Sequence, residues 1–234
     1  MQYNGEFKLI DSLEKAYLLG LIIADGSNIY NKQSGGYSTT IKLKKSDEYL
    51  LDKIVSIFPF FKKGKTETSK KGFKSEYIRK YDKNLFNDLL NHGVFPRKSF
   101  ENASKIFLPK LNKELFFAYL HGICDGDGTI YQSKEGWIRI DLIGKANNLF
   151  LEIQNKLKTF DIESTVYYRE KRNYYLLRIS NKKDIKKIIE NFSKTPFCLK
   201  RKFSPYFNAD WDRIPGYDNK NTNYIPWFAT TSNH

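Results

Sequence analysis

The sequence predicts an α+β protein made of two similar halves, each with the element order αββαββα. A short motif in the first half returns about a hundred positions later, at the spacing of a duplicated domain. The segments that follow each copy show the same succession of strand-like and helix-like hydrophobic patterns. We therefore expect an approximate two-fold axis between the halves, with the two motif helices at their interface.

The repeat is visible in two short segments. Residues 16–30 read AYLLGLIIADGSNIY, and residues 118–131 read AYLHGICDGDGTIY. Both begin with Ala-Tyr-Leu, carry a glycine two places later, and end with Asp-Gly, a small hydroxyl residue and Ile-Tyr. The aspartates at equivalent positions are Asp25 and Asp127. This division predicts an N-terminal half over 1–104, a C-terminal half over 105–203 and a C-terminal extension over 204–234.

Each motif is expected to lie on a helix. Asp11 and Glu14 have the spacing of a capping box, which predicts a helix that begins near Ser12 and runs to Ala24. Asn112 can cap the second motif helix in the same way.

Strand and helix patterns then alternate in the same order in both halves. A strand pair interrupted by glycine follows each motif, and its second strands, TTIKLK and WIRIDL, alternate apolar and polar residues. Each such strand should bury one face and expose a charged one. Helical stretches follow over 47–58 and 146–157, then a second hairpin, and then helices that include 81–90 and 180–189.

The composition indicates a polyanionic partner. The 234 residues contain 40 Lys and Arg against 26 Asp and Glu, a formal charge of +14, as in proteins that bind phosphate backbones. The apolar run from Ala16 to Ala24 is shorter than the ~20 residues of a membrane span, so no membrane partner is expected. Cys124 and Cys198 do not have zinc-site spacing, which favours an intracellular, reducing compartment, with cytoplasm and organelle matrix both open.

Small residues four apart make each motif helix a candidate for close packing: Gly20 and Ala24 in the first, Gly122 and Gly126 in the second. If the two helices pack in parallel, their C-terminal ends meet and bring Asp25 and Asp127 together. Two adjacent carboxylates repel unless a cation lies between them, and hard oxygen ligands suit Mg²⁺.

Two other metal-binding classes share a D-x-D-G-T string with residues 125–129. A phosphatase of the haloacid dehalogenase type needs a β-strand before the string, whereas the preceding ELFFAYLHGIC has a helical pattern. An EF-hand needs glutamate at the twelfth loop position, and counting from Asp125 that position is Gly136. Asp125 is instead interpreted as a hydrogen-bonding residue near the helix end, and His121 as a packing residue.

Segments 18–26 and 120–128 resemble the two motifs of a monomeric LAGLIDADG homing endonuclease. GVFPRKS at 93–99 and LKRK at 199–202 resemble segments that often close each half in that family. The sequence departs from the motif at Leu19 and His121, where small residues are usual, and at Ile23, where an acid is common. The resemblance covers about residues 10–203 and includes the aspartate at the eighth position of both motifs.

The resemblance implies a saddle of two antiparallel four-stranded sheets that lies in the major groove of duplex DNA. It also implies cleavage of both strands at a long asymmetric site, with short 3′ overhangs. By carry-over, Asp25 and Asp127 hold Mg²⁺, with Ca²⁺ or Mn²⁺ as substitutes, helped by the carbonyls of Ala24 and Gly126. A lysine should assist at the phosphate, and the candidates are Lys183, Lys182 beside it, Lys83 in the first half, and Lys42.

DNA contacts are expected from the polar faces of the strands, where Arg can read guanine and Lys more often binds phosphate. The candidates are Lys42, Lys44, Arg79, Lys80, Arg139, Asp141, Arg169, Lys171, Arg172 and Arg178. The predicted function is a site-specific, metal-dependent DNA endonuclease that acts as a monomer without a small-molecule cofactor. The alternative is an intron RNA maturase, with intron RNA as its partner, or a DNA-binding protein of the same fold that does not cleave.

Overall fold

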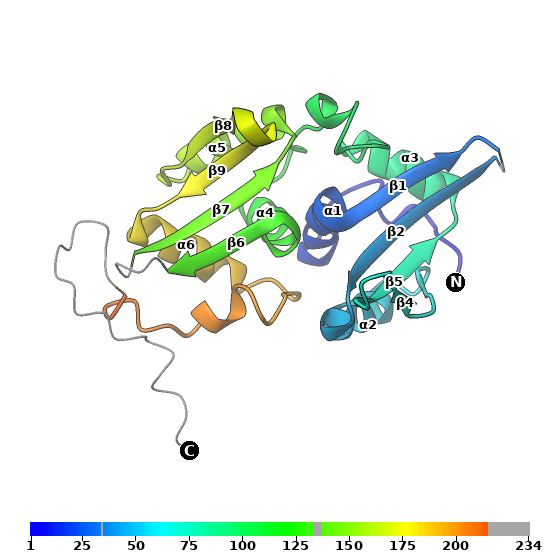
Figure 1. The fold of residues 1–234 in the computed structure, drawn as a ribbon, viewed down its shortest axis with the longest axis horizontal. Coiled ribbons are helices and arrows are strands. Elements are labelled where there is room, and N and C mark those ends of the chain that lie inside the picture. The colour runs from blue at the N-terminus through cyan, green and yellow to red at the C-terminus, as the bar shows by residue number, and fades with distance from the viewer. Residues whose placement is uncertain (34, 133–136, 215–234) are drawn as a thin grey trace, which may run out of the picture.

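The structure, a computed structural model, describes residues 1–33, 35–132 and 137–214. Within these residues six α-helices and two antiparallel sheets form the α+β fold that the sequence predicts. Figure 1 shows the two sheets side by side, with one helix from each half between them. No helix of the described residues is long and apolar enough to cross a bilayer.

The second half has the predicted order αββαββα. Its sheet has the order β6-β7-β9-β8, in which the two hairpins of the half lie next to each other. The elements are α4 (Lys113–Asp127), β6 (Gly128–Gln132), β7 (Ile138–Gly144), α5 (Asn147–Lys158), β8 (Thr165–Arg169), β9 (Tyr174–Ile179) and α6 (Lys182–Phe192).

The first half repeats this order with one difference. Its elements are α1 (Leu13–Asp25), β1 (Gly26–Asn31), β2 (Gly36–Lys44), α2 (Glu48–Ile57), β3 (Lys62–Lys63), β4 (Glu67–Thr68), β5 (Lys74–Lys80) and α3 (Lys83–Asn91). The predicted four-stranded sheet has five strands here, because β3 and β4 both pair with β5 and replace one continuous edge strand.

A bulge explains the split edge. Lys63 pairs with Ile78 and Glu67 with Ser75, so three residues, 64–66, lie opposite two, 76–77. One extra residue on an edge strand interrupts the ladder locally. Gly64 lies so close to Tyr77 that an added Cβ would be 2.0 Å from its ring. The edge strand therefore bends where the second half has the regular strand β8.

Polar caps start both motif helices where the sequence predicts. The Ser12 side chain accepts a hydrogen bond from the Lys15 N–H, and Asn112 Oδ1 accepts one from the Leu115 N–H at 2.9 Å. Such bonds satisfy amide groups that have no partner inside the helix. Asp11 contributes differently, through an ion pair with Lys15 at 2.8 Å. Each helix runs directly into the first strand of its own sheet.

The motif helices α1 and α4 pack in parallel with their backbones in contact. A Cβ atom on Gly20 would lie 2.0 Å from the carbonyl oxygen of Tyr119, and one on Gly122 would lie 2.0 Å from that of Tyr17. A Cβ on Gly126 would meet the Cβ of Ala24 at 2.2 Å. Contacts advance in the same direction along both helices, so their C-terminal ends lie together.

The segment that closes each half docks onto the opposite half. In the first crossing, Asn148 on α5 donates a hydrogen bond to the carbonyl of Ser104 at 2.6 Å. In the other, Arg201 forms an ion pair with Asp47 at 2.9 Å, and the Lys200 N–H donates to the hydroxyl of Tyr49 at 2.6 Å. Each closing segment therefore also contacts the opposite half across the interface.

The predicted extension is described only as far as residue 214. Trp211 and Ile214 are buried and belong to the hydrophobic core, so residues 204–214 pack against the body. Residues 215–234, which include Trp227, lie outside the described part. The division of the chain at residues 104 and 203 stays a prediction.

Candidate active site and nucleic-acid interface

Two aspartates converge where the motif helices end. Asp25 is the last residue of α1 and Asp127 the last of α4. A Cβ on Gly126 would lie 3.4 Å from the carboxyl carbon of Asp25, which shows how closely this side chain approaches the second helix. The C-terminal end of a helix carries a partial negative charge. Two carboxylates at two such ends create a strongly cation-attracting position.

Burial shifts the pKa of both carboxyl groups upward. Burial raises the pKa of Asp127 to about 6. The positive charge of Lys98 lowers this pKa, whereas the negative charge of the nearby Asp25 raises it further. Burial also raises the pKa of Asp25, while Lys202 and Lys98 oppose that shift. Both side chains keep surface in contact with solvent. A carboxylate that is costly to charge yet reachable from solution gains most from a bound cation.

Two lysines approach these aspartates from the closing segments. Lys98 donates a hydrogen bond to the carbonyl of Ala24, the last residue but one of α1. Lys202 donates to the carbonyls of Gly126 and Gly128, both at 2.8 Å, at the end of α4. An ammonium group at a helix C-terminus satisfies free carbonyl groups and complements the helix dipole.

Burial and neighbouring charges shift the pKa values of the two lysines in opposite directions. Burial lowers the pKa of Lys98, and the negative charges of Asp127 and Asp25 act in the opposite direction. Burial likewise lowers the pKa of Lys202, while Asp125 acts against the shift. The two ammonium groups are thus partly dehydrated cations beside the paired carboxylates, as electrostatic stabilisation of a phosphate requires.

Reasoning from the sequence did not identify Lys98 or Lys202 as site residues. A signal was present, because each closing segment carries a lysine at nearly the same distance, about 75 residues, after its motif aspartate. Neither segment has a helical or strand period that would have placed the side chain. Their approach to the site depends on how the chain crosses to the opposite half.

The lysines that the sequence favoured lie on other elements. β9 passes the level of Gly128 at Leu177 and continues to Ile179 before α6 begins, so Lys182 and Lys183 follow the end of that strand. Lys83 occupies the same position at the start of α3. Lys42 follows Ile41, the partner of Gly26, so it lies on β2 level with Asp25, in an ion pair with Glu67 at 2.5 Å. A catalytic role for these four stays a prediction.

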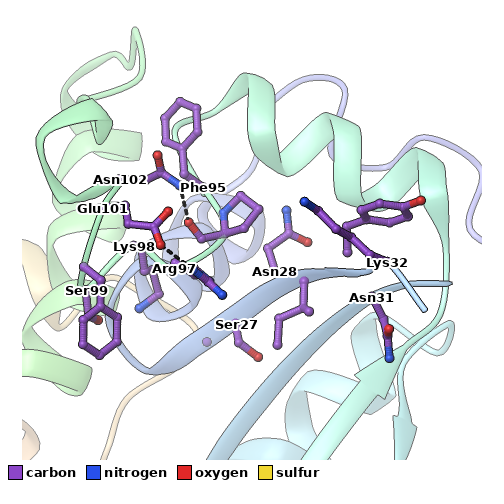
Figure 2. Close-up of a pocket in the computed structure, with 15 residues that line it drawn as sticks. Ser27, Asn28, Asn31, Lys32, Phe95, Arg97, Lys98, Ser99, Glu101 and Asn102 are labelled. Carbon is purple, nitrogen blue, oxygen red and sulfur yellow. Dashed lines mark hydrogen bonds and ion pairs between the residues drawn. The ribbon is translucent and has the colours of Figure 1, made fainter. Parts of the chain in front are cut away.

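A hollow lies just beyond the end of each motif helix, the first beginning at Gly26 and the second including Asp127. The first, about 770 Å³, lies between β1 and the loop of residues 95–102 and is lined by Ser27, Asn28 and Lys98 among others. Figure 2 shows this hollow with Lys98 and Arg97 on one side and the strand of Ser27 and Asn28 on the other. The second, about 560 Å³, lies at the equivalent place in the other half; its lining includes Asp127, Thr129 and Lys202. Each hollow thus joins the start of a first strand to a closing-segment lysine.

The donor set limits which metal the site can hold. Among the described residues no group of three or more His, Cys, Asp or Glu side chains is arranged to hold an ion. Asp25 and Asp127 supply hard carboxylate oxygens, and the carbonyls of Ala24 and Gly126 already accept hydrogen bonds from Lys98 and Lys202. The residues fit a cation that keeps several water ligands, which is the preference of Mg²⁺.

The outer face of the first sheet is basic. Strand register places Lys42 beside Tyr77, and Arg79 beside Thr40, on the face opposite the buried Ile41 and Ile78. Lys44 and Lys62 belong to the same outer face. Lys80 does not, because it pairs with the buried Thr39 and donates to the carbonyl of Met1. The alternation of side chains along β5 thus places Lys80 and Arg79 on opposite faces, and a DNA contact by Lys80 stays a prediction.

The outer face of the second sheet is rich in arginine. Arg139, Arg169 and Arg178 share it with Asp141. Arg178 donates two hydrogen bonds of 2.7 Å to the Asp141 carboxylate, a bidentate pair that raises the pKa of the arginine. Asp141 therefore orients Arg178 on this face. Lys171 and Arg172 lie in the exposed turn η3 (Glu170–Arg172) between β8 and β9.

We compared the chain with known protein families and with solved structures. Residues 114–193 match the model of a LAGLIDADG-like domain. The K262A mutant of I-SmaMI superposes with a TM-score of 0.57 at 13% identity, covering 85% of this chain and 89% of that one. Mesophilic variants of the homing endonuclease I-DmoI give 0.53 at 17%, covering 77% and 94%.

A third similar structure is the N-terminal LAGLIDADG domain of DUF199/WhiA, with a TM-score of 0.52 at 15% identity, covering 82% of this chain and 90% of that domain. I-DmoI has been solved in complex with DNA and Ca and with DNA and Mn, and I-SmaMI bound to uncleaveable DNA. No curated protein matches the chain in sequence.

Proposed function

We propose that this chain, which has the fold of the LAGLIDADG homing endonucleases and a LAGLIDADG-like domain over residues 114–193, cuts both strands of duplex DNA at a long asymmetric site. One observation carries the proposal: Asp25 and Asp127 meet at the ends of two parallel helices, each beside a lysine from a closing segment. Paired carboxylates with raised pKa values are costly unless they bind a cation.

The sheets supply the binding surface. Their outer faces carry Lys and Arg side chains at alternate strand positions, which suits phosphate contact and base reading in a major groove. The strands of a duplex run antiparallel and are related by two-fold axes, and the halves of this chain are related in the same way. Each hollow would therefore serve one strand, the first with Asp25 and Lys98, the second with Asp127 and Lys202.

The chemistry is divided between a cation and the side chains. A divalent ion held by Asp25 and Asp127 would lower the pKa of an attacking water and stabilise charge on the phosphate. Mg²⁺ suits the donor set, and the I-DmoI complexes with Ca and Mn support the choice of a divalent ion. Lys98 and Lys202 place positive charge beside the reacting phosphates and hold the helix ends in position.

The presence of both Asp25 and Asp127 favours a cleaving enzyme over an intron RNA maturase or a binding protein without nuclease activity. A protein that only bound nucleic acid would gain affinity by losing two negative charges next to the phosphates. The product expected by analogy with the fold is a double-strand break with short 3′ overhangs, made by a single chain.

Selection from a randomised duplex library tests the proposal. The purified chain is incubated with the library and Mg²⁺, and the cut ends of both strands are sequenced. We expect one long site, cut on both strands, and we expect Asp25→Asn and Asp127→Asn each to remove cleavage while gel-shift affinity for the selected site survives. If no library member is cut, or if both variants cut at the parental rate, the proposed function is wrong.

A further inference from the structure

A buried carboxylate joins three separate segments beside the active site. Asp125 on α4 is fully buried, and its Oδ2 accepts hydrogen bonds from the Tyr17 hydroxyl on α1 at 2.5 Å and from the Leu199 N–H at 2.8 Å. His121, one turn earlier on α4, has Nε2 3.6 Å from the same oxygen. Tyr17 belongs to the first motif helix and Leu199 to the closing segment of the second half.

Among the described residues, the first half has no equivalent of this arrangement. The motif positions that correspond to His121 and Asp125 hold Leu19 and Ile23, both buried apolar residues. Tyr119, which corresponds to Tyr17, has a buried hydroxyl that finds no hydrogen-bond partner in the part of the chain that the structure describes. Aliphatic side chains therefore fill these positions well enough for helix packing. Burying a carboxylate is costly even when it is hydrogen-bonded, so packing does not explain Asp125.

The hydrogen bond from Leu199 to Asp125 holds the stretch of chain that carries an active-site lysine. Lys202, which donates to the carbonyls of Gly126 and Gly128, follows three residues after Leu199. Between them, the Lys200 N–H donates to Tyr49, and Arg201 pairs with Asp47, so this stretch is held from the first half as well. Asp125 anchors the same stretch from inside α4, two positions before the metal-binding candidate Asp127.

We propose that Asp125 is a positioning residue that fixes the closing segment of the second half, so that Lys202 is held at Asp127 for cleavage of one DNA strand. The statement on cleavage rests on the proposed function. The first half achieves the corresponding placement of Lys98 without a buried carboxylate, so loss of Asp125 should affect the two strands unequally.

Cys198 provides a test that needs no DNA. It precedes Leu199, is partly buried, and has a thiol whose pKa is raised by burial, so release of the segment should speed its alkylation. We expect Asp125→Ala to raise the iodoacetamide labelling rate of Cys198 about tenfold, measured by peptide mass spectrometry, with the fully buried Cys124 as internal reference.

Conservative variants separate positioning from a general loss of structure. Asp125→Asn keeps one acceptor oxygen and should label at an intermediate rate. Tyr17→Phe removes one hydrogen bond from Asp125 and should label faster than the parental chain. Tyr119→Phe is the matched control, because it removes the hydroxyl group at the equivalent position of α4, where that group makes no hydrogen bond to the described residues. In this variant Cys198 should be alkylated at the parental rate.

Strand-specific cleavage then tests the consequence. On the selected duplex with each strand end-labelled, Lys202→Met should slow one strand most and Lys98→Met the other. Asp125→Ala should slow the same strand as Lys202→Met and let nicked product accumulate, whereas partial unfolding would slow both strands alike. Equal slowing of both strands, or unchanged Cys198 labelling, overturns the role of Asp125. A parental chain that cuts no DNA overturns the proposed function, and the labelling result then decides the anchoring of the segment by itself.

Discussion

The carbonyl oxygen of Tyr119 lies where Gly20 leaves room for it, 2.0 Å from the position of a missing Cβ atom, and Tyr17 and Gly122 repeat the arrangement. Because both contacts involve backbone atoms, neither helix can give way by rotating a side chain. This approach sets the separation of α1 and α4, and with it the separation of Asp25 and Asp127.

Substitution of either glycine should therefore affect both stability and chemistry. We expect Gly20→Ala and Gly122→Ala each to lower the free energy of unfolding by about 2 to 3 kcal/mol through overpacking, measured by urea denaturation, and to slow cleavage. Gly72→Ala is the control, since nothing lies within 4 Å of its Cβ position and only its φ of +81° opposes the change. It should cost about 1 kcal/mol. Equal costs at all three positions would show that the helix contact is not tight.

DNA affinity should depend steeply on salt. Each phosphate neutralised by Lys or Arg contributes about 0.9 to the slope of log K against log salt, so a slope steeper than about −4 is expected from the two basic sheet faces. Lys44→Ala should reduce the slope by about 0.9, because Lys44 lies on the outer face. Lys80→Ala is matched in charge but lies on the covered face, and should leave the slope unchanged. Equal effects in gel-shift titrations would place the interface elsewhere.

Cleavage should depend on pH through Asp127, whose pKa is about 6 without a metal. The carboxylate form binds the cation, so activity should be fully present above this pKa and lost as pH falls through it. Proton and cation compete for the same oxygens, and a higher Mg²⁺ concentration should therefore move the midpoint to lower pH. Single-turnover rates from pH 5 to 8 at two Mg²⁺ concentrations measure this, with circular dichroism as the control for folding. A midpoint that does not change with Mg²⁺ concentration would show that Asp127 does not bind the metal.

Stability in acid should reflect His121. Burial lowers the pKa of this side chain to about 3, against about 6.5 in an unfolded chain. Between these values the unfolded state binds the proton more readily, so the contribution is fully present above pH 6.5 and is lost as pH falls toward 3. His121→Leu, which copies Leu19, should remove about 3 kcal/mol of the decline in unfolding free energy between pH 7 and pH 4.

Asp125 acts in the opposite sense, since burial raises its pKa to about 6, and it contributes to both profiles because it is present in both proteins. Parallel pH profiles for the parental chain and His121→Leu would mean that His121 remains neutral in both states or titrates equally in both.

The parts of the fold that the sequence predicted depend on local patterns. The motif helices, their starts near Ser12 and Asn112 and the order αββαββα follow from spacing within a few turns, although the residue that caps α1 is Ser12 rather than the predicted Asp11. His121 is confirmed as a packing residue, stacked on Phe192 at 4.3 Å between ring centroids. The bulge after Lys63 was not predictable, because it depends on the ring of Tyr77 in another strand.

The candidate site was predicted in part for the same reason. The aspartates end helices whose geometry fixes them, whereas Lys98 and Lys202 lie in irregular segments whose paths depend on contacts with the opposite half. Lys80 was grouped with Arg79 as a DNA contact, whereas the alternation along β5 places these neighbours on opposite faces, and the sequence does not reveal where the strand is in register. Asp125 was interpreted as a hydrogen-bonding residue near the helix end, and its two partners, Tyr17 and Leu199, are 108 and 74 positions away.

The contacts of the closing segments with the opposite half limit how the molecule can be recombined. The Arg201–Asp47 ion pair and the Asn148–Ser104 hydrogen bond cross the boundary in opposite directions, so each closing segment is held in part by the other half. A chimera that joins one half of this chain to a half from a relative would need compatible docking surfaces on α2 and α5 as well as matching glycines on the motif helices. With matching glycines but without the docking surfaces, the two carboxylates would still meet, whereas Lys98 and Lys202 would no longer be held beside them.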